Sequence, residues 1–431
     1  MLILFITAFF IIFLPNEGLA SERLQDIIDS AKEGATIKLK NRTYEGNIEI
    51  HKSVTIIGSK KTIIKGDGTG NVISVHAPDV QLHYLTVVNS SMDRNSSEEY
   101  AAIKLHSHHN VLDHIAIKDS YHGVYLSQSH HNLVQNVKVT GMGKKEIAAQ
   151  GNGIHMYYSN DNTLKNNQIS GVRDGMFFDY ANDNKIYNNS ISETRYGLHY
   201  MYSDTNEFKE NLFTYNTGGA TIMHSNGIIL ENNRFILNYG HRSFGLFLLS
   251  SNETKVENNL FFLNQRGIYI DQSTNNVYRN NRMIKNQIGI ELWASSNEQI
   301  FTENTIQENT IPAVSLGGLG HNSWSQNGKG NNWGNAFHLI DLDQNGFGDQ
   351  PVSYHSSLNQ LIEDQELTYL FLKSPAIAVY EELNRFLQKE KTMFEDPYPL
   401  LSRGKWRLHP LWFAAPIVIT FIIFRKGRKR S

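Results

Sequence analysis

Methionine and histidine residues in the middle of the chain have the types and spacing needed for metal chemistry. Met201 and Met223 stand 22 positions apart, and histidines recur beside them at multiples of the same spacing. A thioether combined with imidazole is a ligand set that suits Cu(I). The chain has no cysteine, so soft-metal chemistry must use Met and His, and a thiolate site, a disulfide or a Cys nucleophile is excluded. The candidate copper ligands are His155, Asp179, His199, Met201, Met223 and His224.

The same spacing also allows an apolar docking patch, with histidines that are only incidental. Phe177, Phe247, Leu249 and Trp293 share the face on which these ligands are expected. Exposed methionine and aromatic side chains are typical of surfaces that another molecule covers. The two interpretations are compatible, because a protein that passes a metal on also needs a surface for its partner.

Enzyme chemistry is the competing class, because parallel β-helices often act on polysaccharides. A glycosidase needs two carboxyl groups within about 10 Å of each other. The outward carboxylates occur singly, and Asp179 and Asp271 are four repeats apart, which at one strand spacing per repeat is about 19 Å. No catalytic residue is therefore assigned, although a lyase, epimerase or hydrolase stays an alternative.

Two further groups of residues could bind metal. A histidine-rich stretch contains His106, His108, His109, His114, His122, His130 and His131, which are either ligands or substitutes for turn asparagines. Residues 341–349 follow the spacing of a calcium loop, with oxygen ligands at positions one, three, five and nine and Gly346 at position six. Position twelve is Val352 instead of Glu, so a turn held by side-chain hydrogen bonds is the alternative. The candidate Ca²⁺ ligands are Asp341, Asp343, Asn345 and Asp349.

A repeat of 22 residues must position these side chains. Glycine recurs at that spacing, with one four-residue insertion near residues 240–243, at Gly153, Gly175, Gly197, Gly219, Gly245, Gly267 and Gly289. Asparagine follows most of these glycines after nine and fourteen positions. Such a period is typical of a solenoid, in which each coil stacks on its neighbours. Asn suits the turns because it tolerates left-handed backbone and its amide can bond the next Asn in the stack.

The repeat predicts an all-β fold, a right-handed parallel β-helix. The first and third residues after each glycine are mostly large and apolar and should point inward, while the second and fourth should point outward. Residues 24–31 are expected to form an amphipathic helix that caps the first coil. Near the other end, Ser374 and Pro375 are typical of a helix start, and that helix should continue to about Lys389.

The two ends predict export and a membrane anchor. Residues 2–14 are apolar and are followed by small residues up to Ala20, as in a signal peptide, with an uncleaved anchor as the alternative. Residues 411–424 are uncharged and apolar, and five Lys and Arg residues follow them. The positive-inside rule then places the tail in the cytoplasm and the body outside. The expected parts are a signal peptide (1–20), the β-helix (21–340), an Asp-rich loop with the final strands (341–373), a helical linker (374–406), a transmembrane helix (407–424) and a basic tail (425–431).

Three runs resemble the coils of one family, NosD, the extracytoplasmic maturation proteins of nitrous oxide reductase. They are residues 173–180 (RDGMFFDY), 195–203 (RYGLHYMYS) and 220–225 (ATIMHS), and the resemblance extends over the exported body, including residues 66–68 and 341–349. The resemblance implies Cu(I) binding and a scaffold that is not an enzyme. It also implies three partners: an ABC transporter with ATPase and permease subunits, a membrane-anchored copper chaperone and nitrous oxide reductase. The membrane is expected from the C-terminal segment instead, and this anchor departs from the family, whose periplasmic members generally lack one. No nucleic-acid partner is expected, because the net charge is only −2.

Overall fold

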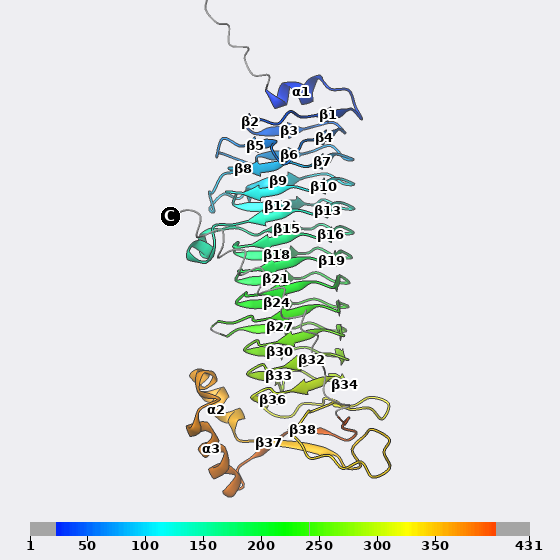
Figure 1. The fold of residues 1–431 in the computed structure, drawn as a ribbon, viewed down its shortest axis with the longest axis vertical. Helices are drawn as coiled ribbons and strands as arrows, with labels where there is room; N and C mark the ends of the chain where they lie inside the picture. The colour runs from blue at the N-terminus through cyan, green and yellow to red at the C-terminus, as the bar shows by residue number, and fades with distance from the viewer. Residues whose placement is uncertain (1–22, 241, 402–431) are drawn as a thin grey trace, which may run out of the picture.

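The computed structural model describes residues 23–240 and 242–401 of the chain. Its strands form three parallel sheets, and each coil contributes one strand to each sheet, which gives a right-handed parallel β-solenoid (Figure 1). The expected signal peptide, transmembrane helix and basic tail lie outside the described residues. Among the residues that are described, no helix is long and apolar enough to cross a membrane.

The first sheet consists of twelve three-residue strands, each with its middle side chain buried in the core. They are β1 (Thr36–Lys38), β4 (Thr55–Ile57), β7 (Gln81–His83), β10 (Val111–Asp113), β13 (Leu133–Gln135), β16 (Thr163–Lys165), β19 (Lys185–Tyr187), β22 (Glu207–Lys209), β25 (Ile229–Glu231), β28 (Lys255–Glu257), β31 (Val277–Arg279) and β34 (Ile300–Thr302).

The second sheet has the same pattern, and inside it the rings of Phe213, Phe235 and Phe261 stack at 5.0 and 4.9 Å. Its strands are β2 (Thr43–Glu45), β5 (Ile63–Lys65), β8 (Thr86–Val88), β11 (Ala116–Lys118), β14 (Lys138–Thr140), β17 (Gln168–Ser170), β20 (Ser190–Ser192), β23 (Leu212–Thr214), β26 (Arg234–Ile236), β29 (Leu260–Phe262), β32 (Arg282–Ile284) and β35 (Thr305–Gln307).

The third sheet has mostly longer strands and carries the predicted ligands. Its strands are β3 (Ile48–Ile50), β6 (Ile73–Val75), β9 (Ala101–Leu105), β12 (His122–Ser127), β15 (Ile154–Tyr157), β18 (Asp174–Asp179), β21 (Tyr196–Met201), β24 (Gly218–Met223), β27 (Phe244–Leu249), β30 (Arg266–Asp271), β33 (Ile288–Trp293) and β36 (Ile311–Leu316). The predicted inward residues, such as Ile154, Leu198 and Tyr200, are all buried. The inward and outward assignment is therefore confirmed.

The repeated glycines let neighbouring coils approach closely. A Cβ on Gly197 would lie 2.5 Å from the carbonyl oxygen of Gly219, and one on Gly219 would lie 2.3 Å from that of Gly245. Real Cβ atoms do not approach an oxygen so closely, so this column accepts only glycine. The backbone at these positions is not left-handed, and close packing is the reason for the repeat.

Asparagine ladders join the coils at all three turns, as through Asn162, Asn167 and Asn216. The backbone N–H of Asn167 donates to Oδ1 of Asn189 at 2.9 Å, and Asn189 donates to Oδ1 of Asn211 through its backbone N–H at 2.9 Å and its side-chain amide at 3.0 Å. The predicted amide bonding is confirmed. The left-handed backbone, however, falls on the preceding residue, as at Asn166 (φ 58°) and Asn188 (φ 54°).

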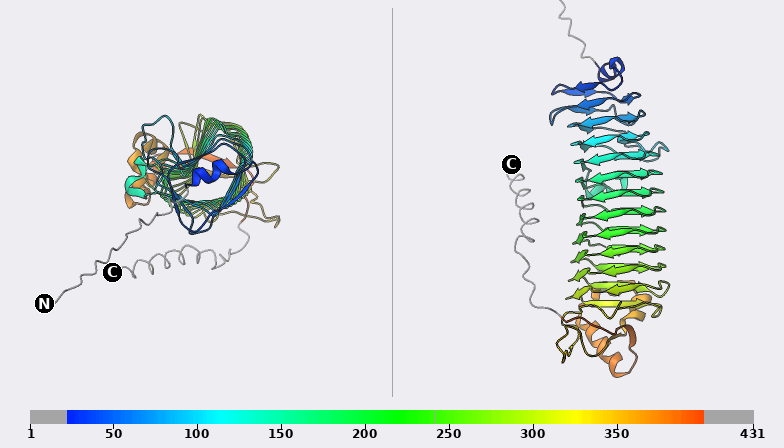
Figure 2. Two further views of the ribbon diagram at one scale, coloured as in Figure 1. Left: turned by 90° about the horizontal axis from the view of Figure 1, so that it is seen from above. Right: turned by 90° about the vertical axis from the view of Figure 1, so that its right-hand side faces the viewer.

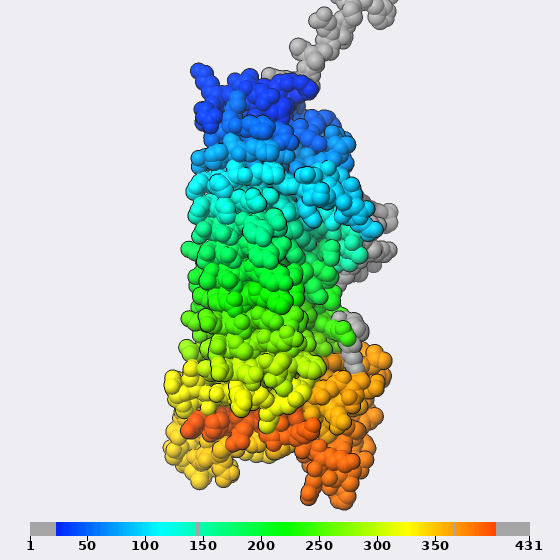
Figure 3. All heavy atoms as spheres, turned by 180° about the vertical axis from the view of Figure 1, so that it is seen from behind, coloured from blue at the N-terminus to red at the C-terminus, as the bar shows by residue number. Residues whose placement is uncertain are grey.

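Both ends of the solenoid are covered. Helix α1 (Leu24–Ser30) lies across the first coil with Leu24 and Ile28 buried, as predicted (Figure 2). At the other end follow an antiparallel pair, β37 (Val352–Ser356) and β38 (Lys391–Asp396), and between these strands α2 (Leu358–Asp364), the 3₁₀ helix η2 (Glu366–Phe371) and α3 (Pro375–Phe386). A further 3₁₀ helix, η1 (Lys144–Ala149), lies in the loop before β15. The space-filling view shows the coils as successive bands, with the C-terminal segments at the base (Figure 3).

The elements without a repeat differ most from expectation. Strand β37 falls in the range 341–373, where final strands were predicted, but strand β2 and helix α2 were not predicted, and β38 lies inside the range 374–406 that was predicted as a helical linker. Helix α3 starts at Pro375 and has Ser374 as its N-cap, as expected, but ends at Phe386, three residues early. Its apolar face is largely uncovered, since only Ile377 is buried while Leu383 and Phe386 are exposed.

Candidate metal sites on the third sheet

Two columns of side chains run along the outer face of the third sheet. The methionine column is defined by the in-register residues Ser127, Tyr157, Asp179, Met201, Met223, Leu249 and Asp271. The histidine column, two residues earlier in each strand, contains Tyr125, His155, Phe177, His199, Thr221, Phe247 and Tyr269. Neighbouring members of a column are about 4.8 Å apart along the solenoid.

Met201 and Met223 are nearest neighbours in the methionine column, one on β21 and one on β24. Asp179 stands directly before Met201 in the same column, on β18. All three side chains are half-buried. Burial raises the pKa of Asp179 above its usual value, with a smaller opposing effect from His199. The thioethers of the pair can therefore turn toward one point in a partly desolvated place beside a carboxyl group.

His199 lies two residues before Met201 on β21, on the same outward face, and a buried carboxylate orients it. Its Nδ1 lies 3.0 Å from Oδ2 of Asp174, and Nε of Arg195 donates to Oδ1 of Asp174 at 2.9 Å. Although burial acts to raise the pKa of Asp174, hydrogen bonds from His199 and Arg195 hold it below the usual range. An ionised Asp174 can accept a proton from Nδ1, and the neutral ring in that tautomer carries its lone pair on Nε2; Nη2 of Arg195 also lies 3.3 Å from Nδ1. Histidine ligands of metals usually have such a carboxylate behind them.

His155 is not part of this group. It lies two coils away, and the ring of Phe177 stands between it and His199 at 4.7 and 4.6 Å. Its ligand atom lies instead within 4.8 Å of those of Glu99 and His122. Burial lowers the pKa of His155 well below its usual value, so the ring is neutral.

Glu99, His122 and His155 lie close together, with both histidines buried and Glu99 partly exposed. Nδ1 of His122 accepts the backbone N–H of Asn152 at 2.9 Å, so its Nε2 carries the proton and donates to Glu99 at 2.6 Å. This hydrogen bond is the main cause that lowers the pKa of Glu99. Glu99 was not predicted, because it lies in the loop between β8 and β9, where no repeat exists.

His224 belongs to a turn and not to the methionine pair. It has left-handed backbone (φ 51°), is exposed, and its ring stacks on Tyr202 at 5.1 Å. The same stack continues through Tyr180 to Tyr158. Of the six predicted copper ligands, Asp179, His199, Met201 and Met223 thus lie in two adjacent columns over three successive coils, whereas His155 and His224 have their contacts elsewhere.

The Asp-rich loop brings its carboxylates together. Oxygens of Asp341, Asp343 and Asp349 lie within 4.8 Å of one another. Asn345 belongs to the same loop, and its side-chain amide forms hydrogen bonds inside the loop. Its Nδ2 donates to Asp343 at 2.8 Å, and its Oδ1 accepts the N–H of Phe347 at 2.8 Å. Gly346 has φ 90°, as the sixth position of a calcium loop requires. The predicted oxygens are close in space, and both alternatives, a Ca²⁺ site and a hydrogen-bonded turn, fit this geometry.

Comparison with known proteins gives one family and one fold. Residues 137–337 match the model of a family described as periplasmic copper-binding protein (NosD). This range contains all six predicted copper ligands but not residues 66–68 or 341–349. No curated protein matches the chain.

Several solved structures are similar in fold. The periplasmic alginate epimerase AlgG is 14% identical with a TM-score of 0.50, covering 70% of this chain and 83% of its own. A PL6 alginate lyase in complex with a trisaccharide is 12% identical with a TM-score of 0.50, covering 74% of this chain and 85% of its own. The alginate lyase AlyF-OU02 with G6 has the same values of identity, TM-score and coverage. At such identities the similarity concerns the β-helix alone.

Proposed function

We propose that this chain holds Cu(I) on the outer face of its third sheet and acts as an accessory protein, not as an enzyme. The match over residues 137–337 assigns it to the NosD family of periplasmic copper-binding proteins. The family description supports copper binding in general. The residues of the third sheet support the +1 oxidation state, because thioether and imidazole ligands suit Cu(I).

The observation that carries the proposal is the pairing of Met201 with Met223 beside His199. The two methionines are in register on adjacent strands, and the contact of Asp174 with Nδ1 of His199 favours the tautomer in which Nε2 has a lone pair for a metal. Two thioethers and one imidazole supply three ligands, and the fourth position stays open for exchange with a partner. Asp179, at the end of the group, adds a negative charge beside the cation. His155 and His224 are not ligands in this proposal, because their contacts lie elsewhere.

The C-terminal helices support docking on a membrane partner. Seven apolar side chains of η2, α3 and the residue after α3 are about half exposed or more: Leu367, Leu370, Phe371, Val379, Leu383, Phe386 and Leu387. Contiguous exposed apolar surface is typical of an interaction site. We propose that this surface, here called the helical patch, binds the permease of an ABC transporter whose ATPase is cytoplasmic.

The remaining partners follow from the NosD resemblance. A membrane-anchored copper chaperone would deliver Cu(I), and the protein would support assembly of the copper–sulfide centre of nitrous oxide reductase. The body would be extracytoplasmic, with a signal peptide at residues 1–20 and an anchor at residues 407–424.

The Asp-rich loop would bind Ca²⁺ and stabilise the base of the solenoid. A melting temperature unchanged by Ca²⁺ would rule out that site.

A Cu(I) titration tests the proposal. The full-length protein is titrated under anaerobic conditions against a chromophoric Cu(I) chelator, as wild type and as Met201→Leu/Met223→Leu. Leucine has nearly the volume of methionine, so the variant loses the thioethers and keeps the packing. We expect an affinity at least tenfold weaker. Leu249→Ala, in the next coil of the same column, is the matched control and should bind as wild type. Equal affinity in all three proteins would refute the assignment.

A polysaccharide-active enzyme is the second candidate function. The observation in its favour is the cluster of Asp174, Arg195 and His199, which combines a carboxylate, a guanidinium and an imidazole on the outer face of the sheet. Such groups can move a proton next to an acidic sugar. Turnover of uronic-acid polymers that is lost on Asp174→Asn or Asp179→Asn would support this function, and no turnover by the wild type would exclude it for these substrates.

A further inference from the structure

The methionine column continues upward into a run of histidines in the first coils. Extending the registers of β3, β6, β9 and β12 by one residue places His51, His76 and His106 in line with Ser127. Their imidazole rings stack, with centroids 4.7 and 4.8 Å apart and interplanar angles of 7° and 4°. His51 and His76 were not among the predicted ligands, because the 22-residue repeat is not visible in the sequence of these coils.

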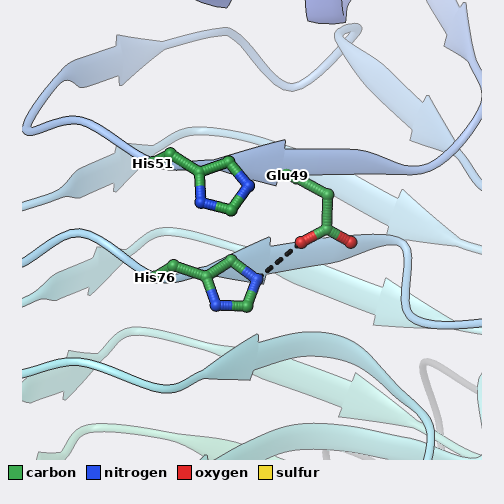
Figure 4. Close-up of side chains that lie close together, drawn as sticks. All are labelled: Glu49, His51 and His76. Atoms are coloured by element: carbon green, nitrogen blue, oxygen red, sulfur yellow. Dashed lines mark hydrogen bonds and ion pairs between the residues drawn. The ribbon is translucent and has the colours of Figure 1, made fainter.

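A carboxylate completes this group. Glu49 is two residues before His51 on the same outward face, and its Oε2 lies 2.6 Å from Nε2 of His76 (Figure 4). The ligand atoms of Glu49, His51 and His76 all lie within 4.8 Å of one another, and the three residues are exposed. Figure 4 shows the three side chains converging from two adjacent strands.

Other stacked histidines in the chain are used differently. His109 and His131 stack at 5.1 Å, but they are turn residues with left-handed backbone. In the neighbouring stack, Nδ1 of His108 and Nδ1 of His130 accept backbone N–H groups at 3.1 and 3.0 Å, as ladder asparagines do with their side-chain oxygens. Among the described residues, no carboxylate forms a candidate metal-binding group with either pair. The turn histidines are therefore structural, and the group at residues 49–76 is the one arranged for a ligand.

We propose that Glu49, His51 and His76 form a second metal site, which binds a divalent transition-metal ion of the Zn²⁺ or Cu²⁺ class. Two imidazoles and one carboxylate are a common three-ligand set for such ions, with the fourth position left to water or to another ligand. Calcium and magnesium prefer sites made of oxygen, and the absence of a thioether from this group disfavours Cu(I). His106, stacked on His76, is placed to supply a fourth nitrogen.

The site needs only small movements to close. Tetrahedral coordination with metal–nitrogen bonds of about 2.05 Å places two nitrogens about 3.3 Å apart, and the stacked rings are now 4.7 Å apart. Rotation of exposed side chains can provide this change, because no core packing opposes it. His76 is five coils from Met201 in the column, a distance of about 24 Å. The ion is thus separate from the proposed Cu(I), and this inference does not depend on that function.

Zn²⁺ titration of the full-length protein by calorimetry tests the second site. The test variant is His51→Asn/His76→Asn, and the matched control is His109→Asn/His131→Asn, which removes the same number of exposed stacked histidines. We expect wild type and control to bind Zn²⁺ alike, and the test variant to lose one equivalent or to bind it at least tenfold more weakly. Met201→Leu/Met223→Leu should bind Zn²⁺ as wild type does, so the failure of either site can be recognised separately.

Co²⁺ gives a second readout, since its visible absorption reports its ligands directly. The wild type should show the bands of tetrahedral Co²⁺, and Glu49→Gln should shift or weaken them without changing the thermal unfolding temperature, because Glu49 is exposed. Zn²⁺ binding that is unchanged in the double histidine variant, or lost equally in the control, would overturn the proposal.

Discussion

Replacing Asp174 by Asn should weaken Cu(I) binding, although Asp174 is not itself a proposed ligand. Its Oδ2 accepts the Nδ1 proton of His199 at 3.0 Å, and this bond keeps the lone pair of His199 on Nε2. An amide at this position can present its NH₂ group to Nδ1. The proton would then move to Nε2, and that nitrogen could no longer bind a metal.

The expected size of the effect follows from this role. Loss of the group that orients a histidine ligand costs about 10–100-fold in metal affinity, which is about 1.4–2.7 kcal/mol. The substitution also removes the charged partner of Arg195, whose Nε donates to Asp174 at 2.9 Å. Hydrogen bonds to charged groups contribute about 1.5–3 kcal/mol to stability, so the melting temperature should fall as well.

A matched control separates the two effects. Arg266 and Glu291 form a comparable buried pair on the same sheet, with Nε 2.8 Å from Oε2, and no histidine of the sheet bonds to it. Asp174→Asn and Glu291→Gln are compared by Cu(I) competition and by thermal unfolding. Both should lower stability, but only Asp174→Asn should weaken Cu(I) binding. Equal Cu(I) affinity in the two variants would refute the role of Asp174 in fixing the tautomer.

Three other predictions test the fold and the surfaces. Gly197→Ala places a Cβ 2.5 Å from the carbonyl oxygen of Gly219 and should lower the free energy of unfolding in urea by about 1–3 kcal/mol. Gly70→Ala is the control and should be nearly neutral, because the nearest atom to its Cβ would be 3.6 Å away. Burial lowers the pKa values of His122 and His155, so the unfolded state binds more protons than the folded state as the pH falls below about 6.5. The unfolding free energy of the metal-free protein should then decrease by up to about 1.4 kcal/mol per pH unit for each histidine. An unfolding free energy that stays constant between pH 7.5 and 5.5 would contradict their burial as neutral rings. Leu383→Asp/Phe386→Asp changes side chains that are 55% and 83% exposed. This double variant should no longer co-purify with the transporter permease, and its melting temperature should not fall. Unchanged co-purification would show that the helical patch is not the docking surface.

The repeat made the solenoid predictable. A 22-residue period in glycine and asparagine identifies coils, and the alternation of strand residues then predicts which side chains face outward. The pairing of Met201 with Met223 followed from this arithmetic and agrees with the observed register. Backbone stacking in a solenoid depends on sequence spacing alone, and for this reason the columns could be derived without a structure.

The chemistry inside each column was less predictable, because it depends on contacts that the period does not contain. Asp174 precedes its glycine and was not considered as a partner of His199, although its Oδ2 lies 3.0 Å from Nδ1 of that ring. Glu99 comes from an irregular loop and draws His155 into a different group. His224 has the expected sequence position but a left-handed backbone, which directs its ring onto Tyr202. Spacing predicts the face of a residue, whereas neighbouring loops and turn geometry determine its partners.

X-ray absorption of the Cu(I)-loaded protein at the copper edge tests the central claim most directly. The wild type, loaded with one equivalent of Cu(I), should show sulfur scatterers together with nitrogen from imidazole, and Met201→Leu/Met223→Leu should lose the sulfur contribution. A wild-type spectrum with nitrogen and oxygen neighbours only, or a sulfur contribution that persists in the double variant, would contradict the account of this face as a Cu(I) site.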